Sequence, residues 1–213
     1  MEITRSHIEF AKSDQTDIWS FGNEILYRLC REYPSHQKRD IVVAKIWLIG
    51  RSYAAAVERG KKDKDGEASL SKVNALYEQV AIIMINSELD ERIDALRQYG
   101  TIDDGIIQIL ELHRYLVILL GRLTKDNKRS LASKYLHFHL PNLFYLYDSV
   151  AIQSLTDIKR NQRAKRKVSG DFDNDYKSFF LRLLDLRDEI QQRFGEELTP
   201  RQIDRILWNL SNQ

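Results

Sequence analysis

The sequence predicts an all-α protein that folds as a single compact, orthogonal bundle of about eight helices. Only three prolines and nine glycines occur in 213 residues, fewer than a sheet with tight turns normally needs. Apolar residues recur at three- and four-residue steps, and no segment alternates cleanly as a strand does. Hydrophobic residues make up 43% of the chain, enough for one core. We therefore expect one domain over 1–213, with 1–100 and 101–213 as its possible lobes.

The first half of the chain carries three stretches with helical periodicity. We expect helices over residues 17–32, 37–60 and 69–96. Pro34 ends the first of them. The second is followed by 61–66, which contains only charged residues and a glycine and is therefore expected to be a loop. Asn86 and Ser87 are expected to break the third.

The second half has clearer start and stop signals. Helices are expected over residues 106–123, 129–140, 175–194 and the stretch that follows Thr199. The first of these is apolar nearly all round, which predicts that it is the central helix. In the last, Thr199 can cap the helix, Pro200 fits the first turn and Gln202 completes a capping box.

Charge and cysteine content exclude several classes of protein. The chain has 33 basic and 31 acidic residues, a net charge of +2, which argues against a histone-like protein but permits a local basic patch. Cys30 is the single cysteine, so no internal disulfide can form. No signal sequence or long apolar run is present, which predicts a cytoplasmic protein without a membrane partner. Because no phosphate loop, dinucleotide fingerprint or metal-ligand spacing occurs, we expect no cofactor and no metal.

The segment 159–167 has six basic residues in nine and no acidic one. Such a segment can neutralise phosphates and bind nucleic acid in a salt-dependent way. The alternative is a solvated loop, whose charge Asp171, Asp173 and Asp175 dilute. The predicted nucleic-acid contacts are Lys159, Arg160, Arg163, Lys165, Arg166 and Lys167, extended by Lys128, Arg129 and Lys134.

An aromatic block at 133–149 contains two candidate catalytic residues, His137 and Asp148. His137 and His139 are two residues apart and would point away from each other on a helix, so they should not chelate one metal ion. Asp148 has two interpretations. It either caps a helix that begins near Val150 or places a carboxylate beside a groove.

A second group, Arg51, Tyr53 and Glu58, is a candidate pocket lining. Arg51 and Glu58 are seven residues apart, which on one helix gives them a common face but separates them too far to pair directly. These side chains could line a pocket, or they could join this helix to a neighbour. An enzyme that uses Arg51, Glu58, His137 and Asp148 in one pocket is a further hypothesis.

Residues 131–149 resemble a segment of uncharacterised bacterial helical proteins, which share Ser-Lys-x-Leu-His-Phe followed by Pro, Leu-Phe and Tyr-Asp-Ser. Residues 49–53 and 199–204 are similar to the same group. More distantly, the block is similar to the second half of the helix-hairpin-helix DNA glycosylase module. There a glycine-rich hairpin binds phosphate, and a helix, a proline and then an aspartate that assists base excision follow.

The glycosylase resemblance implies that Asp148, after Pro141, stands at the position of that aspartate. This sequence departs from the family at 125–129, which lacks the hairpin glycines that turn backbone amides towards phosphate. The sequence therefore predicts a nucleic-acid-associated protein with a degenerate glycosylase-like architecture and DNA or RNA as its partner. The alternative is a non-catalytic protein–protein interaction module.

Overall fold

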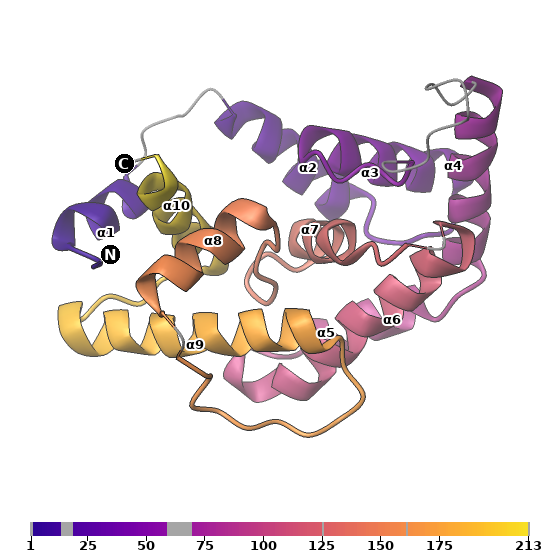
Figure 1. Ribbon diagram of the computed structural model, residues 1–213. Coiled ribbons are helices and arrows are strands. Elements are labelled where there is room, and N and C mark those ends of the chain that lie inside the picture. The colour runs from indigo at the N-terminus through magenta and orange to yellow at the C-terminus, as the bar shows by residue number, and fades with distance from the viewer. Residues whose placement is uncertain (1, 14–18, 59–69, 125, 161, 213) are drawn as a thin grey trace.

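The computed structural model describes residues 2–13, 19–58, 70–124, 126–160 and 162–212 (Figure 1). These residues form ten α-helices and one short 3-10 helix, η1, without any strand, so the all-α class is confirmed while the expected number of about eight helices was too low. The elements are α1 (Arg5–Lys12), α2 (Ser20–Glu32), α3 (Arg39–Ser52), α4 (Leu70–Ile85), α5 (Leu89–Arg97), η1 (Asp103–Gly105), α6 (Ile106–Thr124), α7 (Arg129–His139), α8 (Ser149–Ile158), α9 (Asn174–Phe194) and α10 (Pro200–Ser211).

Helix α3 ends eight residues before the predicted end at residue 60. Ala54 adopts a left-handed backbone conformation (φ 49°), and the chain folds back over Gly50. A Cβ atom at Gly50 would lie 3.1 Å from Ala56 Cα, so this close return favours glycine. The prediction that Arg51 and Glu58 are too distant to pair was therefore wrong, because they do not share one helix and form an ion pair across the turn.

The most buried helix is α7 and not α6, which the sequence predicted to be central. All nine residues from Leu131 to His139 are buried, whereas α6 exposes Ile107 and Ile118. Helices α2, α3 and α6 pack around α7, which lies at the middle of the molecule in Figure 1. Serine, lysine and histidine side chains interrupt the apolar pattern of α7, so hydrophobicity alone does not reveal its burial.

Local capping signals correctly predicted the ends of the later helices. Asp148 caps α8 through a hydrogen bond from Ala151 N to its Oδ1 (2.9 Å). Thr199 and Gln202 form the predicted capping box of α10. The break at Ser87, between α4 and α5, is also observed. By contrast, α1 was not predicted, and it packs on α10, so that the first and last helices of the chain are neighbours (Figure 1).

None of the helices in the described part of the chain has the length and apolar character needed to cross a membrane.

Candidate functional site

A cavity of about 440 Å³ opens among α1, α2, α8, α10 and the end of α3. Four aromatic residues and a set of charged or polar residues line it. The aromatic residues are Phe10, Trp19, Tyr53 and Trp208, and the polar ones include Asn23, Asp148, Arg201, Asp204 and Arg205. The size and mixed lining are those of a small-molecule pocket rather than of a packing defect.

Asp148 reaches this cavity while it caps α8. Its Oδ1 accepts the hydrogen bond from Ala151 N, and its Oδ2 lies 3.4 Å from Lys134 Nζ. Lys134 also donates to Tyr53 O (3.1 Å) and Ser130 Oγ (3.2 Å), and its side chain is only 3% exposed. Both interpretations of Asp148 thus hold, since it is a helix cap and a pocket carboxylate. Lys134 is therefore a buried residue that contacts the carboxylate of the cavity wall. The sequence had suggested that it belongs to an exposed phosphate-binding surface, and its burial does not fit that role.

A second carboxylate in the cavity, Asp204, was not singled out from the sequence. Arg201 Nη1 donates to its Oδ2 at 2.8 Å, and the Asp204 side chain is 19% exposed. Burial raises the pKa of Asp204 from 3.8 to about 6, with the negative charge of Asp148 adding to the rise and Arg201 and Lys134 opposing it. The signal in the sequence was an aspartate three residues after an arginine on a helix that otherwise buries apolar side chains.

The edge of the cavity is formed by aromatic rings and one guanidinium. Arg205 donates to Ala11 O (3.2 Å) and Ser13 O (2.9 Å), and its guanidinium lies 5.2 Å from the centre of the Phe10 ring. The Phe10 and Trp208 rings stack at 6.5 Å. Trp19 and Trp208 are 67% and 52% exposed. Because Arg205 has only carbonyl and hydroxyl partners among the described residues, no carboxylate offsets its charge.

Asn23 provides hydrogen-bond donors on the α2 side of the cavity. Tyr53 Oη donates to Asn23 Oδ1 at 2.7 Å, and the NH2 group of Asn23 has no partner among the described residues. Of the predicted pocket group, only Tyr53 lines this cavity. Arg51 and Glu58 instead pair outside this cavity, and Tyr77 Oη donates to Glu58 Oε2 (2.5 Å).

His137, the other candidate catalytic residue, lies in the core and does not line the cavity. Its Nδ1 donates to Phe144 O (2.7 Å) and its Nε2 accepts from Tyr27 Oη (2.7 Å). Burial lowers the pKa of His137 to about 4, so the ring is neutral. Both nitrogens are occupied in holding the segment after α7, so the enzyme hypothesis that requires Arg51, Glu58, His137 and Asp148 in one pocket is not supported by their positions.

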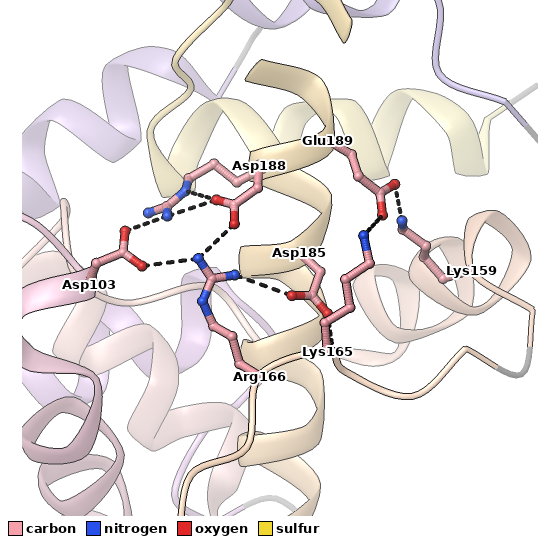
Figure 2. Close-up of polar contacts among 8 residues, drawn as sticks. Asp103, Lys159, Lys165, Arg166, Asp185, Asp188 and Glu189 are labelled. Carbon is pink, nitrogen blue, oxygen red and sulfur yellow. Dashed lines mark hydrogen bonds and ion pairs between the residues drawn. The ribbon is translucent and has the colours of Figure 1, made fainter. Parts of the chain in front are cut away.

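Half of the basic segment 159–167 is neutralised by acidic residues of α9 and η1 (Figure 2). Lys159 and Lys165 both pair with Glu189. Arg166 contacts Asp185 (3.2 Å), Asp188 (2.6 Å) and Asp103 (3.2 Å). The three basic residues of the segment that have no acidic partner among the described residues are Arg160, Arg163 and Lys167.

The predicted extension of the basic patch is also paired. Arg129 contacts Asp173 (2.6 Å) and Asp175 (2.9 Å), and Lys128, whose side chain is 9% exposed, lies 3.4 Å from Asp126. These contacts offset much of the positive charge at the start of α7.

Comparisons with models of known protein families, with curated proteins and with solved structures found no match. The function must therefore be inferred from the chemistry of the cavity and its surroundings.

Proposed function

We propose that the protein is associated with nucleic acid and holds one unpaired nucleotide in the cavity between α2 and α10. The observation that carries this proposal is the position of Asp148. The residue that the glycosylase resemblance selects lies in the wall of an aromatic-lined cavity, beside a buried lysine. The sequence departs from that family at residues 125–129, which contain none of the glycines of the family's phosphate-binding hairpin.

The lining of the cavity suits a nucleobase. Proteins that take up an unpaired base stack it on aromatic side chains and read its polar edge with hydrogen bonds. Trp19, Tyr53 and Trp208 provide rings, while Asp148 and Asp204 provide acceptors. Neither feature requires a double helix, so single-stranded or locally unpaired nucleic acid is the expected partner.

Arg160 and Arg163, two unpaired basic residues of the segment, lie close enough to the cavity to contact a nucleic-acid strand whose base occupies it. Helix α8 begins at the cavity with its cap Asp148 and ends at Ile158, just before Arg160 and Arg163. Ten residues of helix span about 15 Å, the length of only a few nucleotides. A strand with one base in the cavity can therefore bring a nearby phosphate to these arginines, which would make the binding salt-dependent.

The test is a fluorescence-anisotropy titration with short single- and double-stranded DNA and RNA at two salt concentrations, using variants of Gly22. Gly22 lines the cavity, and a Cβ atom there would meet nothing within 4 Å. Gly22→Leu should place a side chain in part of the cavity without disturbing α2, and Gly22→Ala is the matched control. We expect micromolar or tighter binding to single strands, weakened at least about tenfold by Gly22→Leu alone. If the wild-type protein binds no nucleic acid at low salt, the proposal is wrong.

A non-catalytic interaction module is the second candidate, favoured by the outer face of α2. Phe21 is 78% exposed and Ile25, one turn later, is 37% exposed. Exposed apolar pairs on one helix face are a common feature of protein interfaces. Concentration-dependent oligomers that Phe21→Glu dissociates, together with no affinity for DNA or RNA, would favour this function over the first.

A further inference from the structure

The Asp204 carboxylate makes few hydrogen bonds that hold the fold together. Its partner among the described residues is Arg201, which lies on the same helix and holds only Oδ2, so Oδ1 has no partner. It does not cap α10, because Thr199 does so. The titratable groups that interact electrostatically with Asp204 are Arg201 from its own helix, Lys134 from α7, Asp148 from the segment before α8 and Tyr27 from α2. None of these groups donates a hydrogen bond to Asp204 Oδ1.

The ionised form of Asp204 costs stability. Burial raises the pKa of this group above its value in an unfolded chain, so the folded protein binds the proton more tightly. The resulting penalty is absent below pH 3.8 and grows as the pH rises to about 6. A carboxylate that is kept in a cavity at such a cost is typical of a binding or catalytic site.

Asn23 presents the complementary chemistry from another wall. Asn23 lines the cavity, and with Oδ1 occupied by the Tyr53 hydroxyl its NH2 group remains as a donor among the described residues. The cavity therefore combines a carboxylate that only accepts hydrogen bonds with an amide that donates them. Arg205, whose charge no described carboxylate offsets, adds a cation to the cavity lining from α10.

We infer, on the basis of the proposed function, that this cavity is selective for a guanine nucleotide, with Asp204 and Asn23 as the residues that determine specificity. The Asp204 carboxylate accepts from guanine N1–H and N2–H2, the Asn23 amide donates to O6, and Arg205 attracts the phosphate. Guanine is the base whose pairing edge carries two adjacent donors beside one acceptor.

The other bases fit this arrangement less well. Adenine and cytosine each place a ring acceptor beside their amino group, and that lone pair would face the negative carboxylate of Asp204. Uracil and thymine have one ring N–H between two carbonyl acceptors, so one carbonyl would meet the carboxylate. Hypoxanthine keeps N1–H and O6 but lacks the N2 amino group, and it should bind with intermediate affinity.

The experiment is isothermal titration calorimetry of the full chain with the 5′-monophosphates of guanosine, inosine, adenosine and uridine at pH 7.5. We expect the guanosine nucleotide to bind on the order of 10- to 100-fold more tightly than the adenosine nucleotide, with inosine between them. The preference should shrink as the pH falls through 6, because a protonated Asp204 can donate to the adenine ring nitrogen. Equal affinity for the guanosine and adenosine nucleotides would overturn the inference.

Asp204→Asn is the decisive variant, because its fold can be checked independently. It removes the buried charge, so its urea midpoint should exceed that of the wild-type protein at pH 7.5, with the difference vanishing near pH 4. In this variant the guanosine-to-adenosine affinity ratio should fall towards one. The ratio within each protein cancels any general effect of the lost negative charge on phosphate binding. Asp94→Asn, on the exposed surface of α5, is the matched control and should keep the ratio.

The ligand of the cavity is either a guanine within a nucleic-acid strand or a free guanine nucleotide, since both present the same base. Titrations with oligonucleotides distinguish the two ligands. Tighter binding of a single-stranded oligothymidine with one guanine than of the all-thymine strand supports both the inference and the proposed function. Equal, salt-dependent binding of the two strands, without a preference among the monophosphates, overturns the inference and leaves the proposed function standing. Guanosine-selective binding with no affinity for either strand supports the inference for a free nucleotide and overturns the proposed function.

Discussion

At the residue scale, the core contains polar groups whose partners come from distant parts of the sequence. His36 is 2% exposed, its Nδ1 lies 2.5 Å from Asp90 Oδ1, and its Nε2 accepts from Tyr135 Oη at 2.6 Å. Burial lowers the pKa of His36, and the hydrogen bond with Asp90 opposes this shift. His36 thus joins the segment after α2 to α5 and α7. A different buried tyrosine, Tyr145, has no partner for its hydroxyl among the described residues.

These two tyrosines allow a matched prediction. Tyr135→Phe removes the donor to His36 Nε2 and leaves a buried acceptor unsatisfied, which should lower the free energy of unfolding by about 1–3 kcal/mol. Tyr145→Phe removes a hydroxyl that makes no hydrogen bond to any described residue, so it should be neutral or slightly stabilising. Urea denaturation of the two variants measures the difference. Equal losses of stability would show that the His36 contact contributes nothing specific.

At the element scale, α8 depends on the same carboxylate that lines the cavity. Asp148 has an extended backbone, and its side chain accepts from Ala151 N in the first turn. Within the described part of the chain, Asp148 is the residue whose side chain caps this end of α8. The start of the helix and the carboxylate in the cavity are therefore set by one residue, which places a stable helix N-terminus at the cavity wall.

Two substitutions of Asp148 distinguish the stability that comes from its helix-capping hydrogen bond from the stability that comes from its negative charge. Asp148→Ala should lower the free energy of unfolding by about 1 kcal/mol, because the Ala151 amide loses its acceptor. Asp148→Asn keeps a side-chain oxygen for that amide and should retain most of the stability, since asparagine is also a good N-cap residue. Thermal or urea unfolding measures both, with the exposed Gln153→Ala variant of α8 as a control. A loss in Asp148→Asn as large as in Asp148→Ala would mean that the Lys134 ion pair, and not the cap, stabilises this region.

At the scale of the whole molecule, the ion pairs of Figure 2 fix the path of the basic segment across α9. Arg166 and Arg187 both contact Asp103, which ties η1 to this face. Much of the positive charge that suggested nucleic-acid binding is thus used within the fold. Arg160, Arg163 and Lys167 stay exposed, so any phosphate contact of the segment falls to them.

Charge reversal at unpaired arginines of the basic segment tests whether these residues contact phosphate. Arg160→Glu/Arg163→Glu should weaken single-strand binding at least about tenfold and reduce the slope of log affinity against log salt by about 1.4, the value for two phosphate contacts. Arg92→Glu/Arg97→Glu on α5 makes the same change in net charge outside the segment and serves as the control. Anisotropy titrations over a range of salt give both quantities. Equal weakening by the two double variants would indicate an effect of net charge alone.

The amino-acid sequence by itself determined the helical class and most helix ends, because periodicity, proline and capping residues act within a few positions. Pro200 and Thr199 start α10, and Ser87 divides α4 from α5, as expected. The end of α3 was missed because it depends on a close return of the chain over Gly50. Helix α1 was missed as well, and it packs against α10, close to 200 residues away in the sequence.

The candidate site was decided largely by the tertiary structure. Asp148 could be selected from its local pattern, whereas Asp204 and Asn23 became candidates only when α2 and α10 were seen to line one cavity. The sequence likewise could not distinguish Arg160 from Arg166, since both belong to one basic run. The physical reason is that the charge, burial and hydrogen bonding of a side chain depend on neighbours from distant segments, and local spacing does not specify those neighbours.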